Sequence, residues 1–126
     1  MKIQKSAEDY LETILILSRR KTQVRSIDIV NELSFSKPSV SVAMKNLREN
    51  GYVNMDNDGF ITLTDAGRRI AEMIYDRHTV LTRWLVWLGV DEKTAAEDAC
   101  LMEHTMSQET FHLMKDHILK EIGEEA

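Results

Sequence analysis

The chain has 126 residues, of which 43% are hydrophobic and 29% are charged, and its net charge is −5. This length allows one or two small domains with a real core, which excludes an elaborate multidomain enzyme. No apolar run reaches the length of a bilayer, no signal peptide is recognisable, and one cysteine excludes an internal disulfide. We therefore expect a protein of the reducing cytoplasm that has no membrane partner.

Charge is divided unevenly along the chain. Residues 1–69 carry eleven Lys and Arg against nine Asp and Glu, a balance of +2. Residues 70–126 carry five against twelve, a balance of −7. A mildly basic half suits a polyanion such as DNA, whereas a strongly acidic half suits another task, such as binding cations.

The first predicted element is an amphipathic helix from Ser6 to about Arg20. The segment 6–9 resembles a capping box, and apolar residues then recur at helical spacing. Asp9 and Glu12 are three residues apart, so both carboxylates lie near one helical face. An acid in the first turn is favoured by the helix dipole alone, whereas Glu12 lies deeper, among apolar residues.

Two shorter helices are predicted next, at residues 26–33 and 37–50, and residues 34–36 join them in a tight turn. A proline in the first turn of the second helix costs no hydrogen bond, and Gly51 supplies its end. The apolar residues that share a face are Ile27, Val30 and Leu33 in the first helix, and Val40, Ala43, Met44 and Leu47 in the second.

A β-hairpin is predicted directly after these helices. Residues 52–55 and 60–63 alternate between apolar and polar, and residues 56–59 form a turn of Asp, Asn and Gly. Two helices joined by a three-residue turn and followed by a hairpin predict a winged helix-turn-helix, which is a DNA-binding module.

The exposed side of the second of these helices suits a major groove. Small and cationic residues let a helix approach base edges and phosphates, and Pro38 can offer an apolar face to a thymine methyl. The predicted DNA-binding residues are Arg25, Ser36, Lys37, Pro38, Ser39, Ser41, Lys45 and Arg48. A solvated helix face and a protein–protein module remain open alternatives for this pattern.

A long helix, opened by residues 64–67, is expected to extend to Gly89. Its last part, Leu81 to Leu88, carries both tryptophans and is apolar on more than one face, which is typical of a subunit interface. Two further helices are predicted. One runs from Glu92 to about Met106 with Asp91 as its cap, and the other runs from Gln108 to Ile122 with Ser107 as its cap.

Cys100, Glu103 and His104 stand at i, i+3 and i+4, so their side chains are expected to converge on one patch of the predicted helix. His78 of the long helix and the two acids of the first helix can close a shell around a metal. A site rich in oxygen and nitrogen donors suits Mn(II) or Fe(II). Taken alone, such a pattern is more often a small core cysteine beside a common Glu-His pair.

The order of these motifs resembles the diphtheria-toxin-repressor family of metal-dependent transcriptional repressors, including its manganese-transport-regulator branch. The resemblance covers essentially the whole chain. It rests on Ser36-x-Pro38-Ser-Val-Ser41, Leu63-Thr-x-x-Gly67, Tyr75-x-x-His78 and Cys100-x-x-Glu103-His104-x-x-Ser107. It implies a homodimer that binds double-stranded operator DNA when loaded with Mn(II) or Fe(II). The ligands that it implies are Asp9, Glu12, His78, Cys100, Glu103 and His104.

The chain departs from both branches of that family. Iron-type members have methionine where Asp9 stands, and the manganese type has glutamate where Cys100 stands. An ancillary site of the iron type uses a glutamate and a histidine at the positions of Thr82 and Ala96. We also expect the two-domain organisation of the manganese branch, without the SH3-like third domain of iron-type members. The acid in place of the iron type's methionine and the two-domain organisation favour Mn(II) over Fe(II), whereas a Cys100 thiolate would favour Fe(II), Zn(II) or Co(II).

The sequence therefore predicts a mostly α-helical protein with a small β-hairpin. A winged helix-turn-helix DNA-binding domain is expected at 1–69, and a helical dimerisation and metal-binding domain at 70–126. The alternative function is a winged-helix transcriptional regulator that responds to a non-metal ligand. An enzyme with a Cys-His nucleophile or a catalytic metal is disfavoured, because no glycine-rich loop lies near Cys100 or His104. No organic substrate is expected, and a purely structural dimerisation module leaves the basic helix face unexplained.

Overall fold

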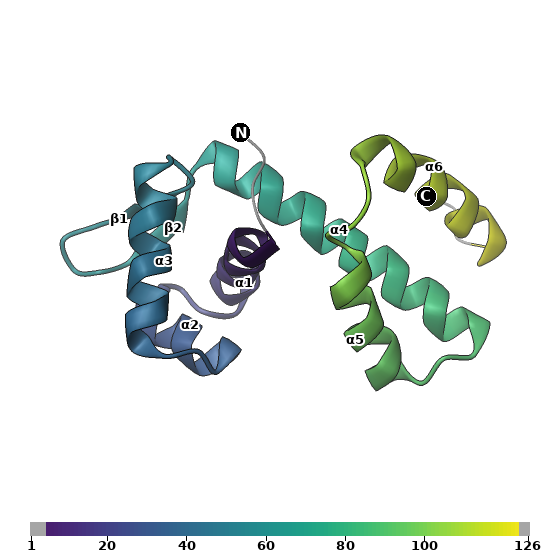
Figure 1. Ribbon diagram of the computed structural model, residues 1–126, viewed down its shortest axis with the longest axis horizontal. Coiled ribbons are helices and arrows are strands. Elements are labelled where there is room, and N and C mark those ends of the chain that lie inside the picture. Colours follow the sequence, from purple (N-terminus) through teal and green to yellow (C-terminus); the bar gives the residue numbers. More distant parts are fainter. Residues whose placement is uncertain (1–4, 124–126) are drawn as a thin grey trace. The chain divides into compact units, whose positions relative to one another are not determined.

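The computed structural model describes residues 5–123, and the chain divides into two compact units, residues 1–73 and 74–126. We call these the N-terminal unit and the C-terminal unit. In chain order the elements are α1 (Lys5–Arg20), α2 (Ser26–Leu33), α3 (Lys37–Glu49), β1 (Val53–Met55), β2 (Ile61–Leu63), α4 (Asp65–Leu88), α5 (Glu92–Met102) and α6 (Gln108–Glu121) (Figure 1). The mostly helical fold with one hairpin is confirmed. No helix within residues 5–123 is long and apolar enough to cross a membrane.

The core of the N-terminal unit is built on α1, whose Leu11, Ile14 and Leu15 are fully buried. The expected capping box at the start of α1 is wrong, because Ser6 already lies inside the helix. Lys5 pairs with Asp9 one turn later at 2.9 Å. Such an i,i+4 pair supports this turn of the helix through a side-chain contact.

α2, α3 and the turn between them form the helix-turn-helix. The buried residue of α2 is Ile29, whereas Ile27 is exposed, so the expected apolar face of α2 was misplaced. Val40, Met44 and Leu47 bury the inner side of α3, as their spacing predicted. In the turn, Ser34 adopts a left-handed conformation with φ of 58°. Its N–H donates to the Val30 carbonyl at 2.9 Å, which ends α2 sharply.

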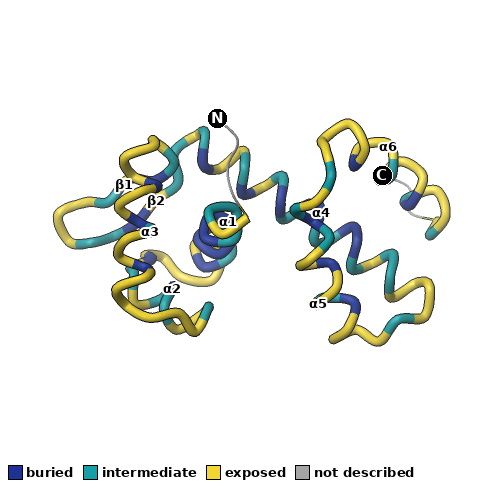
Figure 2. The backbone as a smooth tube through the Cα atoms, viewed as in Figure 1, coloured by how far each residue is buried: buried dark blue, intermediate teal, exposed yellow. Residues whose placement is uncertain are grey.

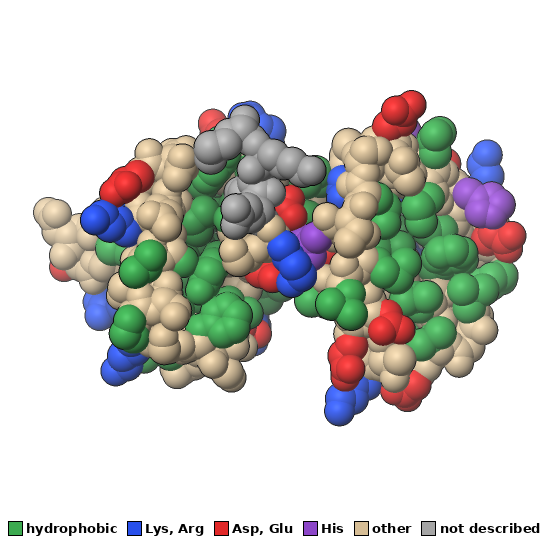
Figure 3. Space-filling model, viewed as in Figure 1, with side chains coloured by type: hydrophobic (Ala, Val, Ile, Leu, Met, Phe, Trp, Pro, Cys, Tyr) green, Lys and Arg blue, Asp and Glu red, His purple; other side chains and the backbone are tan. Residues whose placement is uncertain are grey.

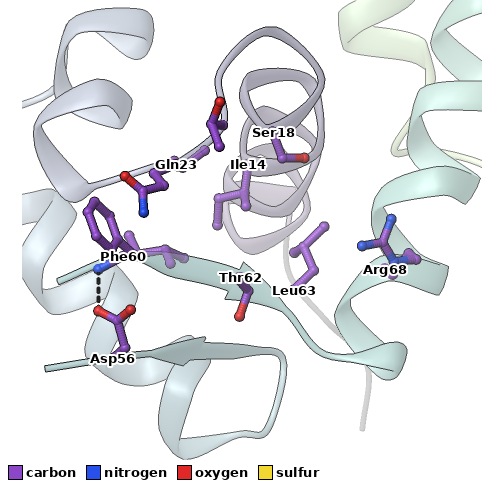
Figure 4. A pocket seen from close by; sticks show the side chains of 11 residues that line it. Ile14, Ser18, Gln23, Asp56, Phe60, Thr62, Leu63 and Arg68 are labelled. Carbon is purple, nitrogen blue, oxygen red and sulfur yellow. Dashed lines mark hydrogen bonds between the residues drawn. The ribbon is translucent and has the colours of Figure 1, made fainter. Parts of the chain in front are cut away.

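The hairpin follows with β1 antiparallel to β2, Val53 lying opposite Leu63. Val24 adds an isolated bridge on the free edge of β2, where the Ile61 N–H donates to the Val24 carbonyl at 2.7 Å. A hollow of about 250 Å³ lies between the hairpin, α1 and the first turn of α4. Figure 4 shows the Phe60 N–H donating to the Asp56 carboxylate at the hairpin turn, at 2.9 Å. The hairpin is thus tied to the connection between α1 and α2 at one edge and closed by its own turn at the tip.

Thr64 and Gly67 lock the hairpin to the start of α4. The Thr64 hydroxyl donates to the Gly51 carbonyl at 2.7 Å and accepts from the Gly67 N–H at 3.1 Å. A Cβ at Gly67 would lie 2.0 Å from the Tyr52 carbonyl oxygen. Only glycine fits there, which gives the Leu63-Thr-x-x-Gly67 motif a physical reason.

The C-terminal unit contains the second part of α4 with α5 and α6. Its core is the cluster Val80, Leu81, Ala99, Phe111 and Ile118, against which Trp84, Met102, Met106, Met114 and Ile122 pack. Asp91 and Ser107 cap α5 and α6 through backbone N–H groups, as expected.

The expected extent of α5 is wrong, because this helix ends at Met102 and not near Met106. Both the N–H and the hydroxyl of Thr105 donate to the Met102 carbonyl, at 3.1 and 2.7 Å. These bonds close a tight turn instead of continuing the helix. Glu103 and His104 therefore lie in the connection between α5 and α6, just beyond the helix that carries Cys100.

Candidate metal centre and nucleic-acid interface

Glu103 is the most unusual residue of the C-terminal unit, since this charged side chain is 0% exposed. Its Oε2 lies 2.9 Å from Nδ1 of His78, which reaches it from α4. Its Oε1 lies 3.2 Å from Nε2 of His104, although no described residue meets hydrogen-bond geometry with Oε1. Two imidazole nitrogens and two carboxylate oxygens thus meet inside the unit.

Burial makes this arrangement costly without a cation. A carboxylate removed from water must be paired, protonated or bound to a metal. The side chain of His104 is only 3% exposed, and that of His78 is 30% exposed. A cluster with imidazole and carboxylate donors fits a divalent first-row metal, and the oxygen donors favour the harder ions. The residues present therefore fit the metal that their sequence pattern implies.

The remaining predicted ligands are placed as follows. Cys100 is exposed near the end of α5, and its Sγ lies within 4.8 Å of a Glu103 carboxylate oxygen. Asp9 and Glu12 belong to the N-terminal unit, where both lie on α1. Glu12 is buried, whereas Asp9 is partly exposed and pairs with Lys5. The structure thus brings His78, Glu103 and His104 together, with the Cys100 thiol beside them.

Seven of the predicted DNA-binding residues lie on α3 or at its N-cap, whereas Arg25 is the N-cap of α2. All eight are exposed, and Figure 2 colours much of α3 as exposed. Ser36 caps α3 by accepting from the Ser39 N–H at 3.2 Å, so these two serines also start the helix. Arg25 lies over the Phe60 ring at 4.4 Å, which places this cation beside the hairpin.

Val42 also lies on this face, although it was not among the predicted DNA-binding residues, which are polar, cationic or proline. Its side chain is 60% exposed, whereas valine is usually buried in a folded protein. It stands four residues after Pro38 and three before Lys45, which puts all three on the outermost stripe of α3. A helical wheel would have identified it.

Arg77 was also missed. It follows the buried Ile74 by three residues and precedes the buried Leu81 by four, so its position belongs to an apolar stripe. A charged residue on such a stripe is the signal that could have identified it.

Comparison with known proteins gives two matching family models. The "Iron dependent repressor, N-terminal DNA binding domain" matches residues 2–59. The "Iron dependent repressor, metal binding and dimerisation domain" matches residues 64–120. The second match contains His78, Glu103 and His104, and the first contains α3.

Individual relatives agree with these models. An uncharacterized HTH-type transcriptional regulator of Methanocaldococcus jannaschii is 36% identical over 115 residues, 90% of this chain and 92% of the relative. The transcriptional regulator MntR of Escherichia coli is 34% identical over 104 residues, 82% of this chain and 67% of the relative. MntR of Lysinibacillus sphaericus is 31% identical over 111 residues, 88% of this chain and 80% of the relative.

Solved structures show the same fold. A manganese-dependent transcriptional repressor in complex with manganese superposes with a TM-score of 0.78 at 30% identity, covering 93% of this chain and 52% of that one. The manganese regulator SloR gives a TM-score of 0.76 at 28% identity, covering 98% of this chain and 55% of that one. The chain therefore spans about half the length of these two proteins.

The fold and these comparisons define a winged-helix transcriptional regulator, and the relatives are regulators and not enzymes. Within that class, the chain belongs to the iron-dependent repressor family, whose DNA-binding domain and metal-binding and dimerisation domain it carries in sequence order.

Proposed function

We propose that this protein is a cytoplasmic metal-dependent repressor. It binds double-stranded operator DNA as a homodimer when loaded with Mn(II) or Fe(II), and so controls metal-ion homeostasis. The observation that carries the proposal is the buried Glu103 between His78 and His104, in the segment that matches the family's metal-binding domain. The functional division proposed is DNA binding by residues 1–69 and metal binding with dimerisation by residues 70–126.

The proposed metal ligands are Asp9, Glu12, His78, Cys100, Glu103 and His104. The contacts of Glu103 with the two histidines support three of them, and the nearby thiol supports Cys100. The assignment of Asp9 and Glu12 as ligands rests on their ligand chemistry and on their three-residue spacing in α1. A bound divalent cation supplies the positive charge that a buried carboxylate needs.

The proposed DNA-binding surface is the outer side of α3 with Arg25. Lys37, Lys45 and Arg48 supply the cations for phosphate contacts, which fix the position of a protein on the duplex. Ser36, Pro38, Ser39 and Ser41 are small enough to let the start of α3 approach base edges. Every one of these side chains is exposed, which supports their availability to DNA.

The proposed dimer surface is the end of α4. Val86, Trp87 and Leu88 are all exposed, with Trp87 at 50%. Hydrophobic side chains are visible on the surface of the C-terminal unit in Figure 3. Trp84 instead packs against the core cluster, so Trp87→Glu tests the interface with less disturbance of the fold than a change at Trp84. Light scattering should report about twice the monomer mass for the wild-type chain and a monomer for Trp87→Glu.

Gating is proposed to work by a shift of population. One cation is proposed to bind both carboxylates of α1 and ligands of the C-terminal unit. Such binding favours the conformations of the dimer in which the two α3 helices fit successive major grooves of DNA. A shift from 1:99 to 99:1 needs a differential affinity of roughly 5.5 kcal/mol. Linkage then requires operator DNA to tighten metal binding by the same factor.

The deciding experiment measures operator affinity under anaerobic conditions with Mn(II), with Fe(II) and with a chelator. We expect tight binding with either metal and weak binding with the chelator. Equal affinity in all three would overturn the proposal and favour the alternative of a non-metal ligand.

Mn(II) is proposed as the preferred metal. Asp9, Glu12 and Glu103 are hard oxygen donors, and Mn(II) binds weakest in the Irving–Williams order, so selectivity depends on geometry. Mn(II) should activate operator binding at least as well as Fe(II). Asp9→Met should shift the preference toward Fe(II), and Cys100→Ala should cost much less activation than His104→Ala. Activation by Fe(II) alone, with Mn(II) inert at millimolar levels, would refute the preference but not the repressor.

A further inference from the structure

Arg77 is a buried cation that the proposed function does not use. It lies on α4, directly before His78, and is 4% exposed. Burying a guanidinium is unfavourable unless its donors are bonded, so such a residue must be held by several acceptors. The acceptors of Arg77 show what it holds in place.

Arg77 donates hydrogen bonds to the segment that connects α5 to α6 and to the first residue of α6. Its Nη1 donates to the backbone carbonyls of Glu103 at 3.0 Å and of Met106 at 2.9 Å. Its Nη2 donates to Oε1 of Gln108 at 2.9 Å. The guanidinium also lies 5.4 Å from the centroid of the Phe111 ring. One side chain of α4 thus spans the whole connection.

Glu103 is therefore held twice by neighbouring residues of α4. Arg77 bonds its backbone carbonyl, and His78 contacts its carboxylate at 2.9 Å. The carbonyl that Arg77 takes belongs to the C-cap of α5, where unpaired carbonyls and the helix dipole both favour a cation. This contact fixes the backbone of Glu103. Because His104 is the next residue, the contact also restricts where the His104 ring can lie.

We propose that Arg77 is a positioning residue for the metal centre: it holds the 103–107 connection so that the Glu103 carboxylate and the His104 ring are preset for one cation. This inference rests on the proposed metal function. Arg77 acts through the backbone carbonyls of Glu103 and Met106 and through the side chain of Gln108. Outer residues that orient metal ligands typically change metal affinity by about 10–100-fold when they are replaced.

The shape of the guanidinium matters more than its charge here. Two carbonyls and an amide oxygen are reached by a planar fork with several N–H donors, whereas lysine offers one compact ammonium group. Arg77→Lys keeps the charge and loses the fork, and Arg77→Met keeps only the apolar stem. If positioning is the role, both variants lose metal affinity. If charge alone mattered, only the methionine variant would lose it.

The test measures Mn(II) binding by the full chain with electron paramagnetic resonance, at a temperature where each variant is folded by circular dichroism. We expect Arg77→Lys and Arg77→Met to bind Mn(II) about 10–100-fold more weakly than wild type, with a changed signal from the bound ion. Arg83→Met, which changes an exposed arginine of the same helix, is the control and should keep wild-type affinity. Wild-type affinity in folded Arg77→Lys would overturn the positioning role.

Gln108→Ala keeps the proposal testable if the Arg77 variants do not fold. Gln108 is exposed at the first position of α6 and supplies one of the three acceptors. Its loss should weaken Mn(II) binding about 2–5-fold, less than the loss of the whole fork. Unchanged affinity in Gln108→Ala together with unfolded Arg77 variants would refute the inference.

A metal-free readout separates this inference from the proposed function. Amide exchange across residues 103–107, and the ring signals of His78 and His104, should change in Gln108→Ala and Arg77→Lys but not in Arg83→Met. A wild-type chain that binds no Mn(II) would sink the proposed function, while these signals would still decide whether Arg77 holds the connection.

Discussion

Two candidate functional sites are built in opposite ways. One is the outer side of α3, and the other is the Glu103 cluster, which consists of His78, Glu103 and His104. On α3 the residues proposed to meet DNA are exposed, and a separate row of Val40, Met44 and Leu47 holds the helix in place. At the Glu103 cluster the side chains of two proposed ligands, Glu103 and His104, are themselves buried. Function and folding are thus separable on α3 and are combined in the C-terminal unit.

This difference has a physical cause. DNA is read from outside, so its contacts need exposed groups on a rigid element. A metal site gains strength from removing its donors from water, where each charge then needs a partner. A change on α3 should therefore alter binding and leave stability near its original value. A change at the Glu103 cluster should alter both.

Glu103→Gln is the change with the largest expected effect, and it can break the comparison. A neutral amide is a poor ligand for a divalent cation, so Mn(II) affinity should fall by at least about 100-fold, and metal-dependent operator binding should fall with it. The metal-free chain should melt at the same or a higher temperature, because a buried charge is removed. Calorimetric titration and thermal melts measure the two effects.

Glu109→Gln is the matched control, because this glutamate is exposed in the first turn of α6. It should leave metal affinity and melting temperature unchanged. Normal Mn(II) binding by Glu103→Gln would remove the Glu103 cluster from the metal site.

Gly67→Ala should have the next largest effect. It tests whether the N-terminal unit also has a position at which no side chain is tolerated. The new Cβ would meet the Tyr52 carbonyl oxygen at 2.0 Å, so the hairpin and the start of α4 must move apart. Overpacking of this kind costs about 1–3 kcal/mol. Urea unfolding should show that loss, whereas Glu72→Ala, exposed on the same helix, should stay within about 0.5 kcal/mol. Equal stability of the two variants would contradict the close approach.

Val42→Ala sharpens the comparison from the DNA side, with a smaller effect. If Val42 meets a thymine methyl, its truncation should weaken operator binding by about 1 kcal/mol, since a buried methylene contributes about 0.8 kcal/mol. Unfolding stability should change by less than about 0.5 kcal/mol, because the side chain is exposed. Fluorescence anisotropy with operator DNA measures the first effect.

Replacing operator thymines by deoxyuridine removes the methyl groups and completes a double-mutant cycle with Val42→Ala. The contact is supported if the two losses are not additive at one thymine position. Fully additive losses at every thymine would show that Val42 reads no methyl group. Lys45→Ala gives the contrast. It should reduce the slope of log affinity against log salt concentration by about one, and it should do so equally for every operator sequence.

Asp28→Asn should have the smallest effect, and it depends on pH. A hydrogen bond from Lys21, followed by one from the Arg25 backbone N–H, lowers the pKa of Asp28 below its ordinary value. A carboxyl with a lowered folded-state pKa stabilises the fold above its unfolded pKa, and that contribution disappears as pH falls through the folded value. Asp28→Asn should therefore be less stable than wild type at pH 7, by about 1 kcal/mol or less.

The difference between Asp28→Asn and wild type should shrink as pH falls below the ordinary pKa of an aspartate and through the lowered folded value of Asp28. Urea unfolding at pH 7 and pH 3 measures this change. A difference that stays constant between the two pH values would assign the effect to something other than the charge.

The sequence determined the features that depend on local rules. The bounds of α2 and α4, the hairpin, and the caps at Asp91 and Ser107 all matched their expected positions. Caps, turns and apolar spacing act over a few residues, so a single chain segment carries enough information to place them. The exposed side of α3 was identifiable for the same reason.

Tertiary structure decided the features that depend on partners far along the chain. α5 ends at Met102 because Thr105 closes a turn on the Met102 carbonyl. The carbonyl of the next residue, Glu103, accepts a hydrogen bond from Arg77, which lies 26 residues earlier in the chain. The helical pattern alone favoured continuing to Met106. Likewise, the sequence named Glu103 and His104 as donors, but burial of Glu103 against His78 required α4 to pack on the connection. Local spacing cannot encode such long-range contacts, because their energy exists only once the core has formed.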